Sequence, residues 1–173
     1  NKVESLRSLF RSGVIKGKEI KEIYGPVEGS AEEIKTVANY LKPLSSKILL
    51  QDDANENNIK EMNMSQFKII HFATHGEVSG ALEGLNEPFL VLTPPDIGNE
   101  KNDGLLTMTE IMTLNTNADL VVLSACNTAA GDMPGSEGFS GLAKSFFISG
   151  SKSILVSNWY VETYSAQELV VSL

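Results

Sequence analysis

The sequence predicts an α/β fold with an open, mainly parallel sheet flanked by helices on both faces. Three runs, at residues 67–73, 120–125 and 153–157, are almost continuously apolar, as expected for strands that are buried on both faces. Segments with helical spacing of apolar residues lie between these runs. Strands that alternate with helices along a chain are typical of parallel sheets with right-handed crossovers.

The first forty residues lead into this pattern. Residues 1–24 are charged, with loosely spaced apolar positions, and we expect a lead-in helix followed by a strand there. Gly-Pro at residues 25–26 breaks the pattern. The stretch from Ser30 to Glu33 matches a capping box, so a helix is expected with Ser30 as N-cap and Glu33 at N3, closed by Pro43.

Shorter elements are expected on either side of the first buried strand. Residues 48–50 predict a short strand, and residues 57–64 a short helix. Residues 89–92 predict a further strand, followed by a loop rich in Pro, Gly and Asn at residues 94–104.

The second half predicts helices that cover the sheet. Residues 107–110 form another capping box, which opens a short helix, and residues 138–150 carry apolar side chains on one helical face. The apolar spacing of residues 166–171 is that of a helix interrupted by the end of the chain. We therefore interpret residues 1–24 as the lead-in segment of a larger chain and residues 25–173 as one domain, truncated at its C-terminal end.

Composition and charge argue against several classes of function. The 173 residues are 42% apolar, enough for a buried core, and 14 basic against 22 acidic side chains give a formal charge of −8. That balance argues against direct contact with nucleic acid or membrane surfaces, and no apolar run approaches the ~18–20 residues of a membrane span. A single cysteine suggests a reducing, cytoplasmic setting. With two histidines and one cysteine, a zinc site is not expected, nor is any other metal or cofactor.

Two of the predicted strands end in reactive side chains. The first leads to His75 and Gly76, and the second leads to Cys126. Reacting groups collect at the carboxyl ends of strands in open α/β sheets, and neighbouring strands lie about 5 Å apart. An imidazole beside a thiol takes its proton and leaves a nucleophilic thiolate. The pattern therefore predicts a Cys/His catalytic pair, with the His about 50 residues before the Cys.

The motifs around these two residues resemble those of the CHAT family, whose domains are similar to caspases and separases and often follow tetratricopeptide repeats. The likeness rests on His-Phe-Ala-Thr-His-Gly at residues 71–76 and Leu-Ser-Ala-Cys-Asn-Thr at residues 123–128. It extends through Asp-Gly-Leu-Leu-Thr at residues 103–107, Ala-Lys-Ser-Phe-Phe-Ile-Ser-Gly at residues 143–150 and Ser-Asn-Trp at residues 157–159. Several motifs in one order make the resemblance specific over roughly residues 25–173.

The resemblance implies a caspase-like fold and a regulated cysteine-type endopeptidase, a thiol protease that hydrolyses a protein or peptide substrate. By this likeness His75 and Cys126 form the catalytic dyad, and the amides of Gly76 and Cys126 form the oxyanion hole. Trp159 resembles an aromatic residue that lines the substrate groove of caspase-like proteases. Ser157 and Asn158 are expected to form hydrogen bonds with an extended substrate.

Some relatives bind an Arg or Lys of the substrate in an acidic pocket, and the resemblance also implies a regulatory partner. Where some relatives carry an acid two residues before the nucleophile, this chain has Ser124, so Asp132, Glu137 and Glu162 are the candidate acids. A regulatory region of tetratricopeptide type, in the same polypeptide or complex, is the expected partner.

Other interpretations remain open. A lone Cys126 is more typical of an inert core position, and Trp159 also fits a rim residue that covers the core. His71 lies within an apolar run and is interpreted as a hydrogen-bonded core histidine. For the domain, the alternatives are a catalytically silent caspase-like module that binds or scaffolds peptides, and an amidase or acyl transferase that uses the same pair on a small molecule.

Overall fold

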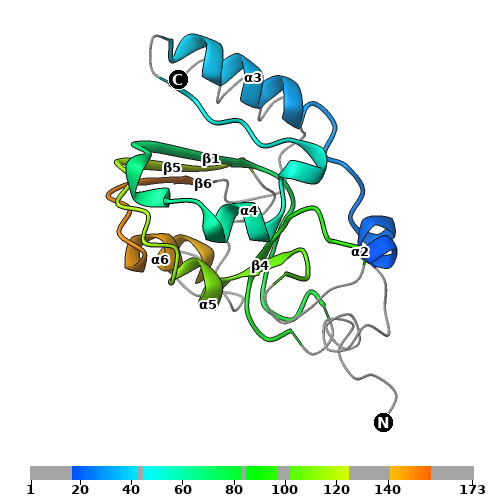
Figure 1. Ribbon diagram of the computed structural model, residues 1–173. Helices are drawn as coiled ribbons and strands as arrows, with labels where there is room; N and C mark the ends of the chain where they lie inside the picture. Colours follow the sequence, from blue (N-terminus) through cyan, green and yellow to red (C-terminus); the bar gives the residue numbers. More distant parts are fainter. Residues whose placement is uncertain (1–16, 43–44, 83–84, 97–101, 125–140, 157–173) are drawn as a thin grey trace.

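The computed structural model describes residues 17–42, 45–82, 85–96, 102–124 and 141–156 (Figure 1). Its helices are α2 (Gly17–Ile23), α3 (Ser30–Tyr40), α4 (Glu56–Glu61), α5 (Met108–Ile111) and α6 (Gly141–Ile148), with short 3-10 turns at Gln51–Asp53 and Met64–Gln66. Its strands are β1 (Ile69–Ala73), β2 (Gly76–Glu77), β3 (Phe89–Val91), β4 (Leu105–Thr107), β5 (Leu120–Ser124) and β6 (Ile154–Val156).

The three apolar runs form one parallel sheet, as the sequence predicts. The strand order is β1-β5-β6, and both pairings are parallel. Ala73 lies opposite Ser124, so β1 and β5 end at the same level. Because β5 has a neighbour on each side, its residues Val121, Val122 and Leu123 are buried.

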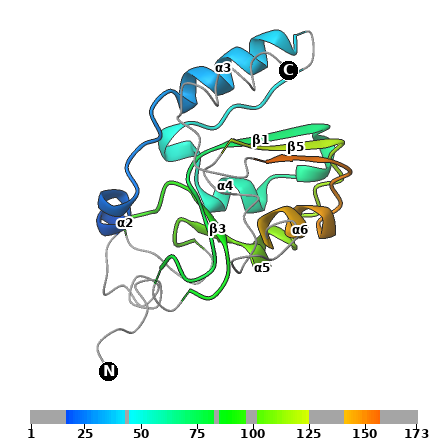
Figure 2. The ribbon, with the colours of Figure 1, turned by 180° about the vertical axis from the view of Figure 1, so that it is seen from behind.

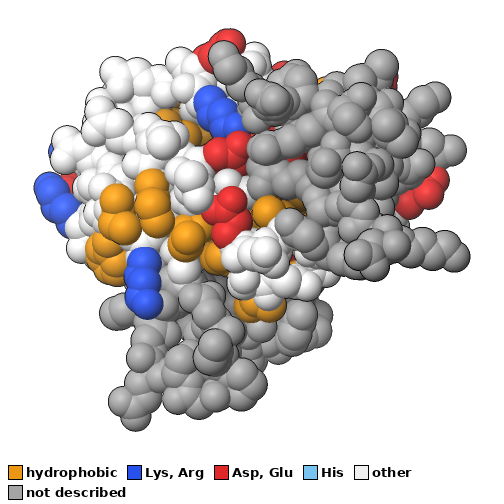
Figure 3. All heavy atoms as spheres, turned by 90° about the horizontal axis from the view of Figure 1, so that it is seen from below, with side chains coloured by type: hydrophobic (Ala, Val, Ile, Leu, Met, Phe, Trp, Pro, Cys, Tyr) orange, Lys and Arg blue, Asp and Glu red, His pale blue; other side chains and the backbone are white. Residues whose placement is uncertain are grey.

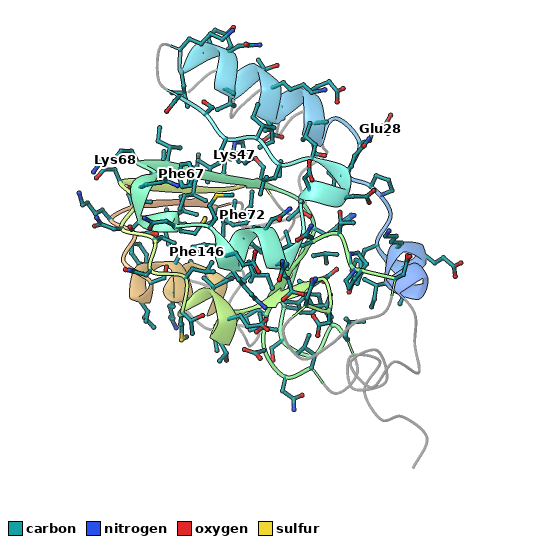
Figure 4. The ribbon with its side chains drawn as sticks, in the orientation of Figure 1. Glu28, Lys47, Phe67, Lys68, Phe72 and Phe146 are labelled. Carbon is teal, nitrogen blue, oxygen red and sulfur yellow. The ribbon has the colours of Figure 1, made fainter. Side chains whose placement is uncertain are left out.

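Helices cover this sheet on both faces, which confirms the predicted architecture. In Figures 1 and 2, α3 lies over one face, and α4, α5 and α6 lie on the other side. The main core fills the second of these layers. Phe72 of β1 and Phe146 of α6 point toward each other across it, with ring centroids 5.6 Å apart (Figure 4).

A second, antiparallel sheet of order β2-β3-β4 lies beside the parallel one. Only β3 is predicted by the sequence. β2 and β4 are two and three residues long and acquire their structure from pairing with β3. Alternate residues of β3 face two cores: Leu90 packs in the main core, while Phe89 and Val91 pack in a smaller one with Ile20 of α2.

Two expected strands are not formed. The strand anticipated near the end of residues 1–24 is wrong, because Gly17–Ile23 is helical and turns Ile20 into the smaller core, followed one helical turn later by Tyr24. Residues 48–50 form no strand and pair with no described strand. There Leu49 packs against the main core, which accounts for its apolar character.

The first capping box is also wrong, whereas the second is confirmed. The N-cap of α3 is Gly29 at φ 79°, and no side chain caps the helix. Instead the Ser30 hydroxyl donates to the carbonyl of Val27 at 2.8 Å, while Glu33 is buried against the sheet. At α5, by contrast, Thr107 and Glu110 make both reciprocal bonds of a capping box.

One buried network joins α4 to the second sheet. The fully buried carboxylate of Glu56 accepts from the amides of Asp103, at 2.6 Å, and Gly104. Lys60 binds Glu56 at 2.6 Å and reaches Glu110 of α5 at 3.1 Å. This network holds together the Asp-Gly-Leu-Leu-Thr motif, which leads into β4.

Several large apolar side chains are exposed on the described surface, among them Ile23, Tyr40 and two residues of α6. Seen from below in Figure 3, hydrophobic side chains gather on the side of α5 and α6. Phe147 and Ile148 of α6 are 40% and 64% exposed. None of the described helices has both the length and the apolar character needed to cross a bilayer.

Candidate active site

The candidate site lies where β1 and β5 end. These strands are parallel neighbours, with Ala73 opposite Ser124, so their carboxyl ends share one edge of the sheet. His75 follows Ala73 by two positions, and Cys126 follows Ser124 by two positions. His75 is among the described residues, whereas Cys126 lies outside them.

The ring of His75 is held by a main-chain carbonyl. Its Nε2 atom lies 2.7 Å from the carbonyl oxygen of Gly25, in the linker between α2 and α3. A carbonyl oxygen can only accept, so Nε2 carries the hydrogen and donates it. In the neutral ring, Nδ1 then keeps the free lone pair. The contact therefore sets which nitrogen is able to take a proton.

An aromatic side chain packs on the same ring. Tyr24 lies with its ring centroid 5.8 Å from that of His75, and it meets Phe89 edge-on at 6.2 Å. Phe89 is fully buried, which anchors this stack in the smaller core. The linker thus contacts His75 through both a side chain and a backbone atom.

The backbone around His75 is fastened to β3. The Val91 amide donates to the His75 carbonyl at 2.9 Å, and the Thr74 hydroxyl donates to the Val91 carbonyl. His75 and Val91 thus share a ladder hydrogen bond, so the next pair, Gly76 and Leu90, is non-hydrogen-bonded. It follows that the N–H of Gly76 points away from β3, on the outer side of β2.

An acid lies two positions beyond His75. Burial raises the pKa of Glu77 above its ordinary value, and the charge of His75 partly offsets that rise. Sequence reasoning passed over this residue, although its place in the His-Gly-Glu string is a usable signal.

A cavity of about 710 Å³ runs along β1 beside this site. It extends from His71 to His75, between the sheet, α3 and the linker of residues 24–27. His75 therefore borders open space on the face of the sheet that α3 covers.

His71 is a core histidine, as predicted, but neither of its ring nitrogens has a hydrogen bond within the described part of the chain, so the expected hydrogen bonding is not found. Its side chain is 8% exposed, and its Nε2 atom lies 2.8 Å from Oε1 of the buried Glu33. The distance is that of an ion pair, although the angles fall outside those of a hydrogen bond. This contact joins α3 to β1 and explains why Glu33 does not cap its own helix.

Most of the predicted substrate contacts lie outside the described residues. These are Asp132, Ser157, Asn158 and Trp159, together with the candidate acids Glu137 and Glu162. Ser124 is described, and its buried hydroxyl has no hydrogen-bond partner within the described part of the chain. In that same part, no group of three or more His, Cys, Asp or Glu side chains could hold a metal ion.

The Gly25 carbonyl is the contact that sequence reasoning missed. It belongs to the backbone, so no residue type announces it. The only available signal was the Gly-Pro break at residues 25–26, which marks a turn but not its contact 50 positions later.

An α/β domain with helices on both faces of a parallel sheet, and with a histidine following the end of one strand, is consistent with a caspase-like fold. The family model of the CHAT domain matches residues 14–173, and the chain belongs to the CHAT family. No match was found among curated proteins.

Proposed function

We propose that this chain is a regulated cysteine endopeptidase, which hydrolyses a peptide bond in a protein substrate through Cys126 and His75. The parallel pairing of β1 with β5 is the observation that carries the proposal. Ala73 lies opposite Ser124, so the segments that lead to the two reactive residues start from the same level of the sheet. Membership of a caspase-like family agrees with this chemistry.

The tautomer of His75 suits the role of base. Nε2 donates to Gly25, so Nδ1 is the nitrogen that takes the proton from the Cys126 thiol. The thiolate then attacks the carbonyl carbon of the scissile bond, and a C–S bond forms. The C–N bond breaks as His75 gives its proton to the leaving amine. Water next attacks the thioester and gives a proton to His75. The C–S bond breaks, and the departing sulfur takes that proton from His75, which restores the thiol and the neutral ring.

The negative charge that develops on the substrate oxygen needs donors. In our proposal these are the amides of Gly76 and Cys126. The orientation of the Gly76 N–H, away from β3, supports this role, because the ladder with β3 does not use that amide. In the same proposal Asp132, Ser157, Asn158 and Trp159 contact the substrate, and a region of tetratricopeptide type regulates the domain.

The test uses the fact that Cys126 is the chain's single cysteine, so every thiol reaction reports on it. Iodoacetamide labelling near neutral pH is followed by mass spectrometry in the unmodified chain and in a His75→Ala variant. We expect the His75→Ala variant to be labelled about tenfold more slowly or worse, because an isolated thiol is mostly protonated there. Circular dichroism checks that both proteins are folded.

Equal labelling rates in two folded proteins would reject the activated thiolate. If His75 accelerates labelling but the chain cleaves no member of a broad peptide library, even beside its regulatory region, the peptide-binding alternative is favoured. Cleavage that disappears in Cys126→Ala confirms the peptidase.

A further inference from the structure

Thr74 and His75 connect the two sheets along the chain, and both are fastened to β3. β1 pairs with β5 as far as Ala73, and β2 begins at Gly76. Between these points, the Val91 amide donates to the His75 carbonyl at 2.9 Å, and the Thr74 hydroxyl donates to the Val91 carbonyl. The main-chain groups of one residue of β3 therefore hold the segment that carries the histidine.

The Thr74 hydroxyl takes the place of a main-chain donor. In a regular antiparallel ladder, two residues that form a hydrogen-bonded pair exchange both of their N–H···O bonds. His75 and Val91 exchange only one, because the Val91 carbonyl accepts from the Thr74 side chain and, within the described residues, from no backbone amide. Without the hydroxyl, the segment would keep only one of its two hydrogen bonds to Val91.

The ring of His75 is held separately by the linker between α2 and α3. Its Nε2 atom donates to the Gly25 carbonyl at 2.7 Å, and Tyr24 packs on the ring with the centroids 5.8 Å apart. A single CH₂ group joins an imidazole to its main chain, so both contacts depend on where the His75 backbone lies. The bonds to Val91 help to fix that backbone.

We propose that Thr74 is a positioning residue for the catalytic histidine, because its hydroxyl holds the His75 backbone against β3 and so keeps the ring in register with Gly25. The inference rests on the proposed function, in which Nδ1 of His75 takes the proton of the Cys126 thiol. The base of such a pair is commonly oriented by a third group, and a displacement of about 1 Å can cost much of the rate. Thr74 acts through His75 and not on the reacting atoms.

Thr93 provides a matched control. Its hydroxyl also donates to a main-chain carbonyl, that of Gln51, at 2.7 Å. Thr74 and Thr93 are both half-buried. Valine has the branched shape of threonine without the hydroxyl, so a valine at either position removes one hydrogen bond of the same kind. Only the substitution at Thr74 removes it beside His75.

The experiment follows iodoacetamide labelling of Cys126 in the full chain from about pH 6 to pH 9, a range that spans the ordinary titration of a thiol. We expect Thr74→Val to be labelled about fivefold more slowly near neutral pH, because the thiolate there depends on a well-placed base. The difference should shrink at the high end of the range, where the thiol ionises without help. Thr74→Ser should restore most of the rate. Thr93→Val should keep it, although both valine variants should lose similar stability in urea.

A double variant shows whether Thr74 acts through His75. In a chain that already carries His75→Ala, adding Thr74→Val should change the labelling rate by less than about twofold, because no base is left to position. A further fivefold slowing would mean that Thr74 affects the thiol by another route, and it would overturn the inference.

An unchanged labelling rate in folded Thr74→Val would also overturn the inference, as would equal slowing in Thr93→Val or a Thr74→Ser variant as slow as Thr74→Val. If Thr74→Val does not fold, Thr74→Ala and Thr93→Ala make the same comparison. Failure of the proposed function is a separate result, because His75→Ala alone would then be labelled as fast as the unmodified chain.

Discussion

Among single residues, Gly104 and Gly80 form a matched pair for testing a close backbone approach. Both have positive φ, 87° and 80° respectively. A Cβ atom on Gly104 would lie 2.6 Å from the Cβ of Pro94 and 2.8 Å from its Cα, whereas a Cβ on Gly80 would meet nothing within 4 Å. The first position needs glycine for space as well as for conformation.

We expect Gly80→Ala to lower the free energy of unfolding by about 1 kcal/mol, the cost of a left-handed backbone with a side chain. Gly104→Ala should cost at least about 2 kcal/mol more, because the chain beside Pro94 has to move. Urea denaturation of both variants measures the difference. Equal losses of unfolding free energy in the two variants would mean that the chain at Pro94 moves aside without an energetic cost.

Gly104 also belongs to the Asp-Gly-Leu-Leu-Thr motif at residues 103–107. Asp103 accepts from the amide of Leu105 at 2.9 Å, and the amides of Asp103 and Gly104 both point at Glu56. The sequence predicts a loop here because of its Pro, Gly and Asn content. It does not predict the buried glutamate that receives the amides, since Glu56 comes from a helix 47 positions earlier.

Among helices and strands, α3 is held to the sheet by a buried contact between Glu33 and His71. Glu33 is 3% exposed and faces His71, whereas the neighbouring Glu32 is exposed. We expect Glu33→Ala to lower the free energy of unfolding by about 3 kcal/mol, because it removes a buried side chain and leaves the polar His71 ring without its neighbour. Glu32→Ala, with the same change in charge, should stay within about 1 kcal/mol.

A double-mutant cycle gives the decisive control. If Glu33 and His71 act as a pair, the double variant Glu33→Ala/His71→Ala loses less stability than the two single losses together. Additive losses would show that each side chain contributes through packing alone.

The two capping boxes show what local patterns can predict and what they cannot. Thr107 and Glu110 follow the pattern and form the cap, whereas Ser30 and Glu33 follow it and do not. The difference comes from tertiary packing, because the Glu33 carboxylate lies against the buried His71 ring and not at the start of its own helix. The long apolar strands were predictable since burial on both faces leaves a continuous run, while β2 and β4 depend on pairing with a partner elsewhere in the chain.

The candidate site, like the fold, was predictable in part from the sequence. His75 and Gly76 follow a strand end, as their motif indicates, and the parallel register of β1 and β5 agrees with the expected shared edge. The acceptor of the His75 hydrogen, the Gly25 carbonyl, emerges only in three dimensions. The pairing with Cys126 remains a prediction.

For the entire domain, the buried Glu56 makes stability depend on pH. Burial, together with the negative charge of Asp103, raises the pKa of Glu56 above its ordinary 4.5, and Lys60 opposes this. The folded chain thus holds the proton more tightly than the unfolded chain. The contribution of Glu56 to stability therefore falls as the pH rises from about 4.5 through the raised value and levels off above it.

Glu56→Gln removes this titration. We expect the stability of the unmodified protein, relative to that of Glu56→Gln, to decline as the pH rises through that interval, measured by urea denaturation at a series of pH values. Glu61→Gln, on the exposed side of the same helix, should leave the slope unchanged. A flat difference between the unmodified protein and Glu56→Gln would contradict the assignment.

The hydrogen bond from His75 to Gly25 has a consequence for how this domain is dissected genetically. The acceptor is a main-chain oxygen, so an alanine scan leaves it in place at every position and overlooks it. Pro26 provides the nitrogen of that peptide unit and cannot donate a hydrogen of its own. Only chemistry on the backbone, such as an ester in place of the Gly25-Pro26 amide, weakens the acceptor while sparing every side chain but that of Pro26.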